Sequence, residues 1–364
     1  MYMKRISLRA RCALILLSCF SLNAFAVNEW TEFYNNTRSL GMGGAGIAIT
    51  SDETSLFRNP ANLGSIRDFY GTILDPEFEA TKNFTDQVSS GSTTKAFDIT
   101  EVKNSLDSHR GSYYHAKMQL TPSFVRRNFG FGLIYKNEIS AEMNAAGTQM
   151  DTKYQSDMGA IIGSDLRLFD GRIKIGASAK IINRIEVNNP ILSTAGPLDI
   201  GTIGSEGTAV AFDGGLLLQA PWAMLPTIGA MVHDVGDTVF DKKDGVREHT
   251  STRPETVKQS IDVAATLFPI HGNGLRSVWT LEYSDISNSR NDTDSAKRIH
   301  AGVELNYHDL VFLRAGYNQR YYTAGFEIAS EHFQWQIATY GEEVGTADTP
   351  REDRRYNTKF SLRF

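Results

Sequence analysis

Cysteine is almost absent from this sequence, which has only Cys12 and Cys19 among its 364 residues. Both lie within the first twenty positions, so the rest of the chain has neither a disulfide framework nor a thiolate metal site. The fold that follows them must therefore be held together by ordinary packing and hydrogen bonding.

Long apolar runs are missing too. After residue 26 no stretch approaches the roughly eighteen consecutive apolar residues of a membrane helix, and the mean hydropathy is −0.29. This test does not detect transmembrane β-strands, whose alternating residues average to an unremarkable hydropathy. The 31 glycines, 20 phenylalanines and 14 tyrosines suit that class of protein.

The first 26 residues have the three parts of an export signal. A basic start at residues 4–11 precedes an apolar run from Ala13 to Leu22, and Ala24-Phe25-Ala26 is a small-x-small cleavage site. The sequence therefore predicts a signal peptide over 1–26 and an exported chain that begins near Val27. An alternative stays open, because Leu16-Leu17-Ser18-Cys19 loosely resembles a lipoprotein site that would leave Cys19 acylated.

Positive charge is also in deficit. Removal of the leader takes four of the 37 basic residues, so 33 remain against 42 acidic ones and the net charge falls from −5 to −9. Such a surface argues against nucleic acid as a partner.

Alternation of apolar and polar residues dominates the chain from residue 65 onward. It is clearest at the C-terminus, where Tyr356, Thr358, Phe360, Leu362 and Phe364 share one face and charged or polar residues occupy the other. This period of two is that of a β-strand with one face toward lipid and the other toward water. Phe360, Leu362 and Phe364 also match the terminal pattern by which barrel proteins resemble one another as substrates of the outer-membrane assembly machinery.

The alternation and its interruptions predict an all-β fold, a transmembrane antiparallel β-barrel of about fourteen strands over residues 65–364. Long polar connections (81–110, 190–205, 236–255, 288–295 and 342–352) alternate with short turns, the outer-membrane arrangement of long external loops and short periplasmic turns. Both chain ends are then expected on the periplasmic side. Within 81–110, Asp98 and Glu101 form a capping-box-like start of a short helix, with a solvated polar loop as the alternative.

Ionisable residues occur on the predicted inner face of the strands. The sequence predicts that they pair with one another and with an internal plug, with an ion or solute path as the alternative. These residues are Lys174, Lys180, Asp262, Glu282, Glu304, Arg314, Glu327, Lys359 and Arg363.

The stretch from Thr37 to Gly64 differs from everything after it. Its four glycines, Gly41, Gly43, Gly44 and Gly46, satisfy G-x-G-x-x-G, but no alternating strand and helix follow, so a dinucleotide site is excluded and no cofactor is expected. We expect glycines there because the chain threads through a confined space. Ser51 or Asp52 is expected to cap a short helix that ends at Asn59, before Pro60.

The run Arg38-Ser39-Leu40-Gly41-Met42-Gly43-Gly44-Ala45-Gly46, followed by Leu56-Phe57-Arg58-Asn59-Pro60-Ala61, resembles the N-terminal hatch of FadL-like outer-membrane transporters. The wider group includes PorV-like barrels of the type IX secretion system and TraF-like barrels. The resemblance implies a fourteen-stranded barrel whose plug is residues 27–64, with Gly41, Gly43, Gly44, Gly46, Asn59, Pro60 and Ala61 as hatch architecture. This chain departs from the pattern at Asn62, where the family commonly has glycine.

Catalytic and metal-binding signatures are not apparent. The eight histidines are scattered without a recognisable triad motif, so no enzyme is predicted. His300 and Glu304 share one face of a strand, but positions i and i+4 lie about 13 Å apart, too far for one metal ion.

The resemblance implies that a hydrophobic small molecule, fatty-acid-like or aromatic, is caught between external loops and leaves sideways through the wall when the hatch shifts. The alternative is a non-transporting barrel that acts as a scaffold or shuttle in a secretion or conjugation-type system. The expected partners are outer-membrane lipid, the barrel assembly machinery and a hydrophobic ligand.

Overall fold

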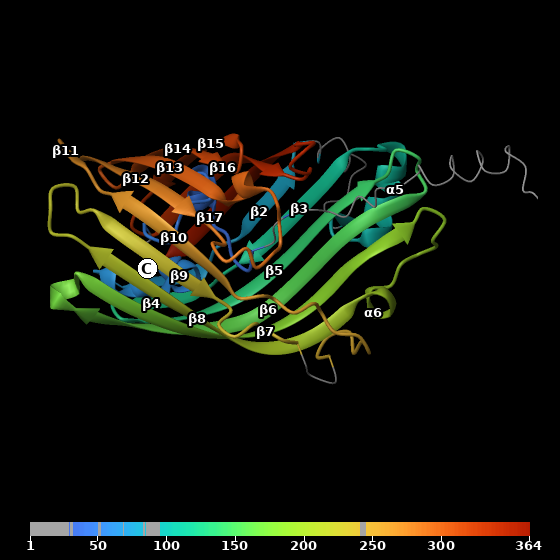
Figure 1. The fold of residues 1–364 in the computed structure, drawn as a ribbon, viewed down its shortest axis with the longest axis horizontal. Coiled ribbons are helices and arrows are strands. Elements are labelled where there is room, and N and C mark those ends of the chain that lie inside the picture. Colours follow the sequence, from blue (N-terminus) through green and yellow to red (C-terminus); the bar gives the residue numbers. More distant parts are fainter. Residues whose placement is uncertain are drawn as a thin grey trace, which may run out of the picture.

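The computed structural model describes residues 29, 32–49, 52–67, 69–82, 84, 95–240 and 245–364. The predicted leader, with Cys12 and Cys19, lies outside these residues, as does Ser51. The described chain forms one closed antiparallel sheet that surrounds a short helical segment (Figure 1).

Seventeen strand segments make up the ring. They are β1 (Tyr70–Leu74), β2 (Glu77–Thr81), β3 (Tyr113–Leu120), β4 (Ser123–Arg126), β5 (Phe129–Met143), β6 (Gln149–Leu168), β7 (Ile173–Leu192), β8 (Ser205–Gln219), β9 (Thr227–His233), β10 (Ser260–Leu267), β11 (Ile270–Gly272), β12 (Leu275–Tyr283), β13 (Ile299–Tyr307), β14 (Val311–Asn318), β15 (Tyr321–Ala329), β16 (Phe333–Glu343) and β17 (Glu352–Arg363).

Three strands of the barrel are each interrupted once at a proline. Pro76 separates β1 from β2, Pro122 separates β3 from β4, and Pro269 separates β10 from β11. Each pair shares the same neighbours, because β1 and β2 both pair with β17, and β3 and β4 both pair with β5. Proline cannot donate to a ladder, which accounts for the breaks. The ring therefore has fourteen strands, as the alternation predicted.

The connections are long at one end of the barrel and short at the other. Turns such as Asn273-Gly274 and 308–310 close the short end, while the stretches 193–204 and 284–298 lie at the long end. Phe364 lies at the short end, where its N–H donates to the Gly71 carbonyl at 3.0 Å.

The expectation that both chain ends lie together was wrong. Glu29, the first described residue, accepts a hydrogen bond from the hydroxyl of Tyr113, which begins β3 at the long-loop end. The reason is that the chain runs along the lumen from the long-loop end and reaches the short-turn end near Leu63, whose carbonyl accepts from the Asn128 N–H in the β4–β5 turn.

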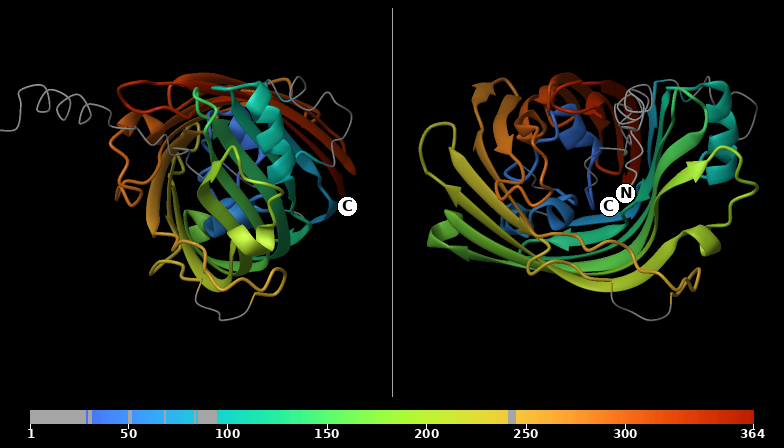
Figure 2. Two further views of the ribbon diagram at one scale, coloured as in Figure 1. Left: turned by 90° about the vertical axis from the view of Figure 1, so that its right-hand side faces the viewer. Right: turned by 45° about the vertical axis from the view of Figure 1, so that its right-hand side comes forward.

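Strands β5 to β8 extend beyond the others at the long-loop end (Figure 1, Figure 2). The outward face of this extension is covered by helix α5 (Ile99–Ser108) and by the stretch that carries α6 (Ile200–Ile203). Ile99, Val102 and Leu106 of α5 pack against Ile139 and other outward residues of β3, β5, β6 and β7. The helix confirms the capping prediction, because the Asp98 carboxylate accepts from the N–H groups of Thr100 and Glu101.

Apolar side chains are exposed around the outside of the barrel below this extension. Alternate residues of β5, for example, expose Phe131 and Leu133, while Gly132 and Ile134 between them are buried. No helix of the described chain is both long and apolar enough to cross a membrane.

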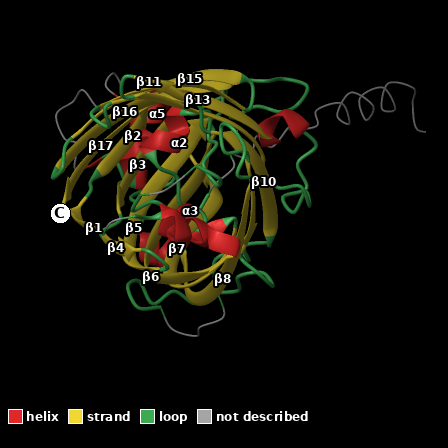
Figure 3. Cartoon of the chain, turned by 90° about the vertical axis from the view of Figure 1, so that its left-hand side faces the viewer, coloured by secondary structure: helices red, strands yellow, loops and turns green. Residues whose placement is uncertain are grey.

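Three short helices lie inside the ring: α2 (Thr37–Gly41), α3 (Ser55–Arg58) and the 3-10 helix η1 (Pro60–Ser65) (Figure 3). The sequence analysis missed α2, whose N-cap Asn36 accepts from the Ser39 N–H. It placed the next helix too early, because the Asp52 carboxylate binds Thr54 and the helix begins at Ser55. We call described residues 29–66 the luminal segment.

Replacement of Leu106 by alanine tests the packing of α5. Leu106 is fully buried in the outward cluster, so we expect its truncation to destabilise the helix by about 2–5 kcal/mol. Hydrogen exchange of the α5 amides measures this as faster local opening. Asn104→Ala, on the exposed face of the same helix, is the control and should change exchange little. Equal effects of the two variants would contradict the packing.

Candidate functional site

An ion-pair network joins α2 to the wall. The Arg38 guanidinium contacts Glu304 of β13 at 2.7 Å and Asp52 at 2.9 Å. Glu304 in turn accepts from Arg314 of β14 at 2.7 Å, and Arg314 also pairs with Glu327 of β15. Burial raises the pKa of Asp52, but Arg38 and the hydrogen bonds from Thr54 outweigh it and hold that pKa below its usual value. These contacts confirm the predicted pairing of inward Glu304, Arg314 and Glu327 with each other and with the luminal segment.

The glycine-rich turn contacts the wall backbone to backbone. Gly43 and Gly44 have φ angles of 73° and 85°, a left-handed conformation that favours glycine. Gly302 of β13 and Gly316 of β14 face this turn, and a Cβ on either would overlap the backbone of Met42 or Gly43. The wall and the turn can approach this closely only because neither has a side chain there.

Polar wall groups satisfy the backbone of the same turn. The Glu282 carboxylate of β12 accepts from the N–H groups of Gly46 at 2.7 Å and Ile47 at 3.1 Å. His300 Nδ1 lies 2.8 Å from the Gly43 carbonyl. The N–H groups that would hold a phosphate in a nucleotide site are therefore bound to a carboxylate of the protein.

The Asn59-Pro60-Ala61 stretch holds the opposite side of the luminal segment in place. Asn59 Oδ1 accepts from the Ala61 N–H at 3.0 Å, and the Asn59 and Asn62 amides both donate to the Ile47 carbonyl at 2.9 Å. Asn62, where the family commonly has glycine, thus joins the two arms of the segment. Gly176 of β7 lies against the Pro60–Ala61 backbone, so this side also approaches the wall at a glycine.

Two cavities flank the luminal segment and share no lining residue. The outer cavity, at the long-loop end, has a volume of about 620 Å³. The inner cavity, at the short-turn end, has a volume of about 720 Å³. Because the segment contacts β14 to β16 on one side and β6 to β8 on the other, it divides the lumen between them.

The outer cavity is lined by both aromatic and charged side chains. Phe33, Phe57 and Phe240 contribute rings, and Lys180 lies 4.8 Å from the ring centre of Phe33. Lys180 also pairs with Asp213 and Asp234. The cavity is therefore amphipathic, unlike a purely apolar pocket.

The wall changes its pairing beside the break between β1 and β2. A bulge lies between Thr72 and Leu74, and Asp75 turns inward, where its carboxylate accepts from the Thr121 N–H at 2.6 Å and contacts the Thr121 hydroxyl. Lys359 lies 3.3 Å from the same carboxylate. On the side of β3 and β4 a carboxylate thus replaces a backbone acceptor, while on the side of β17 the Phe360 N–H still donates to the Pro76 carbonyl at 3.1 Å.

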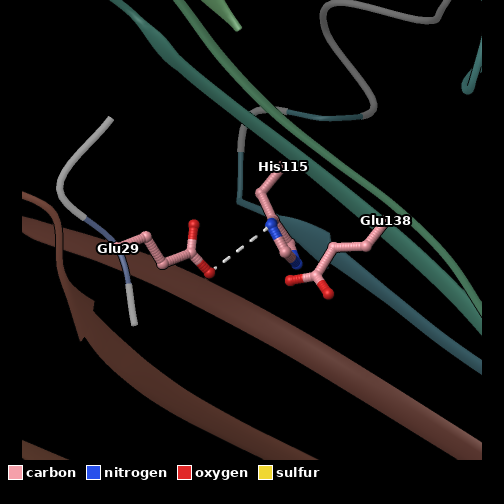
Figure 4. A group of neighbouring side chains, drawn as sticks. All are labelled: Glu29, His115 and Glu138. Carbon is pink, nitrogen blue, oxygen red and sulfur yellow. Dashed lines mark ion pairs between the residues drawn. The ribbon is translucent and has the colours of Figure 1, made fainter. Parts of the chain in front are cut away.

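A buried cluster near the long-loop end has the composition of a metal site. Possible ligand atoms of Glu29, His115 and Glu138 lie within 4.8 Å of one another (Figure 4). Arg355 donates to Glu29 at 2.6 Å, and Lys136 pairs with Glu138 at 3.2 Å. These two cations already neutralise the carboxylates, so a dication would meet their repulsion.

His115 also lies between Ser140 and Glu79 at 2.9 Å from each, an arrangement like a hydrolase triad. The Ser140 hydroxyl donates to Glu29, and neither Ser140 nor His115 lines either cavity. Ser140 and His115 are also almost completely buried, at 2% and 0% exposure, so the cluster serves as a polar anchor of the luminal segment.

Sequence reasoning missed the wall glycines that receive the segment. The sequence does contain a signal for them. On several separate strands, glycines at inward positions alternate with apolar residues at outward positions. They are Gly130, Gly132, Gly163, Gly176, Gly215, Gly229, Gly302, Gly316 and Gly325.

Replacement of Gly302 or Gly316 by valine tests the close approach. A side chain there overlaps the glycine-rich turn, so we expect the turn to move from the wall. A cysteine at buried position Ala45 then reacts with a maleimide at least several-fold faster. Gly214→Val is the matched control, because a Cβ at Gly214 has open space. Equal reactivity in all variants would contradict the contact.

A double-mutant cycle tests the network of Arg38 and Glu304. Arg38→Gln leaves a buried carboxylate with one partner fewer, which we expect to cost roughly 3–5 kcal/mol of stability. Glu304→Gln should cost a similar amount, and the double variant less than the sum. Urea unfolding, followed by the heat-dependent gel shift of folded barrels, measures the coupling. Strict additivity would show that the pair does not interact.

Neither the family models nor the curated proteins include a match to this chain. Solved structures do match its fold. CymD, a monoaromatic hydrocarbon channel, aligns over 90% of this chain and 96% of its own with 10% identity and a TM-score of 0.52. The toluene transporter TbuX of Ralstonia pickettii aligns over 91% and 98% with 13% identity and a TM-score of 0.51.

A FadL homologue of Pseudomonas aeruginosa aligns over 92% of this chain and 98% of its own, with 11% identity and a TM-score of 0.50. At such identities the likeness concerns the fold. It extends over nearly the whole of each chain, well beyond the short motif from which the resemblance was first drawn. The protein is thus a closed fourteen-stranded barrel with the fold of the FadL-like channels.

Proposed function

We propose that this protein lies in the bacterial outer membrane and lets small hydrophobic molecules that also carry a polar group pass across it. The observation that carries the proposal is the luminal segment between two cavities, each lined by both apolar and charged side chains. An open water-filled pore needs no such segment. The similar solved structures described as hydrocarbon channels or a toluene transporter support the same function.

The route begins in the outer cavity and is blocked by the luminal segment. A solute that reaches Phe33 and Phe240 exchanges water for aromatic surface, which favours an apolar body. Passage then requires the segment to leave its glycine contacts on one side. Asp75 and Thr121 meet where the strand of β1 and β2 and the strand of β3 and β4 are both interrupted, and this place is the proposed lateral exit.

Uptake into proteoliposomes tests this function. We expect the intact protein to pass p-cresol but not sucrose, because the segment closes the lumen to hydrated solutes. Deletion of residues 37–64 should admit sucrose as well. Asp75→Ala, which removes the closure of the wall, should speed p-cresol uptake several-fold and leave sucrose excluded. Failure of the intact protein to pass any apolar solute would overturn the proposal.

The scaffold alternative is favoured by one observation, the close packing of the luminal segment on two opposite sides of the wall. If the segment never moves, the barrel stays closed and serves as a scaffold for a partner protein. In that case the intact protein passes nothing, and a partner of fixed stoichiometry remains bound on purification.

A further inference from the structure

Four basic side chains gather at the inner cavity from four different places in the chain. Arg67 follows η1, Arg127 lies in the β4–β5 turn, and Arg167 and Lys174 lie on β6 and β7 beside the turn that joins them. No described carboxylate lies within 4.0 Å of any of them. Two of them have neutral partners, since Lys174 donates to the Ser65 hydroxyl at 2.8 Å and Arg127 to the Ile66 carbonyl at 3.1 Å.

The other basic groups that line this cavity are paired. Arg38 and Arg314 contact Glu304, Arg276 contacts Asp309, and Arg363 lies 3.9 Å from Glu53. The positive excess therefore belongs to the first four, which we call the basic cluster (Arg67, Arg127, Arg167 and Lys174).

Two acidic residues lie near the basic cluster without neutralising it. Asp165 is more than 4.0 Å from both Arg167 and Lys174, and Asp170 lies in the turn. Lys174 is 94% buried and donates to Ser65, and the carboxylate that acts on its charge, Asp165, lies beyond the 4.0 Å of an ion pair. Such a buried charge is costly unless an anion or hydrogen-bond acceptor offsets its loss of water.

Apolar side chains share the lining of the same cavity with the basic cluster. Ile66, Leu217, Leu225, Phe268 and Phe312 belong to its lining, and its volume of about 720 Å³ is that of a site for a small organic molecule. A ligand with a negative end and an apolar body would therefore find both of its parts matched.

We propose that the inner cavity binds the oxyanion of a small amphiphile, a carboxylate or a phosphate, on Arg67, Arg127, Arg167 and Lys174. This deepens the proposed function by naming the chemistry held at the inner side of the segment, and it rests on that function only for the ligand's route. The oxyanion comes either from a free amphiphile or from the headgroup of an inner-leaflet lipid.

Equilibrium binding to the purified full chain in a neutral detergent tests the proposal. Octanoate and octyl phosphate are titrated by calorimetry, and octanol serves as the uncharged counterpart of equal length. We expect Arg127→Gln/Arg167→Gln/Lys174→Gln to weaken both acids at least tenfold and to leave octanol unchanged, because each charge-assisted contact contributes about 1.5–3 kcal/mol.

The matched control is Arg126→Gln/Arg172→Gln. Both residues are exposed, as are Arg67, Arg127 and Arg167 of the basic cluster, but neither lines the cavity, so binding should stay within twofold. The heat-dependent gel shift shows that every variant is folded. Equal weakening in control and test variants would overturn the proposal, as would equal affinity of the wild type for octanoate and octanol.

A lipid arm separates the two sources. The protein is released from nanodiscs that contain equal amounts of phosphatidylglycerol and phosphatidylcholine, and its bound lipid is identified by native mass spectrometry. If the wild type retains phosphatidylglycerol and the triple variant loses it, the site binds a lipid headgroup. If neither soluble acid binds and no anionic lipid is retained, the proposal is wrong. Because binding needs no passage, uptake failure with intact octanoate binding would count only against the proposed function.

Discussion

The close approach of the Gly43–Gly44 turn to Gly302 and Gly316 is the contact on which the arrangement of the lumen depends. A ring of fourteen strands encloses more space than its own inward side chains fill. The chain occupies part of that space with its own N-terminal residues. Glycine at both surfaces lets one backbone lie directly on another, and this fixes where the segment crosses.

Polar contacts also hold the luminal segment against the wall. Arg38 and Arg58 link the segment to wall carboxylates, Lys359 of the wall lies 4.0 Å from Glu53 of the segment, and most of these groups are nearly inaccessible to water. Buried ion pairs offset the free-energy cost of desolvating both charges only when their geometry is good and the remaining polar atoms also form hydrogen bonds. These ion pairs therefore add little to the stability of the segment. Their main effect is to fix it in one position, whereas an apolar interior would allow several positions.

The strands were predictable because each carries its own evidence. Alternation at Phe129 to Tyr135 or Tyr356 to Phe364 shows both the element and its inward face, and an even count follows for a closed ring. The start of α3 and the whole of α2 were not predictable, because the Asn36 cap and the hydrogen bond from Thr54 to Asp52 depend on local geometry. The path of Glu29 to the long-loop end was hidden for another reason, since it depends on Arg355 and Tyr113, more than eighty residues away.

The proline breaks have a consequence for how the barrel closes. β1 and β2 form the first strand of the ring and pair with β17, the last, so the break at Pro76 lies on the seam. The register along that seam shifts within β1, between Thr72 and Leu74, and is then constant from Leu74 through β2, while Pro122 interrupts the next strand at the same level. The ladder to β17 nevertheless continues past Pro76, whose carbonyl accepts from the Phe360 N–H, so the interruption opens only toward β3 and β4, where the Asp75 carboxylate takes the place of a backbone partner for Thr121.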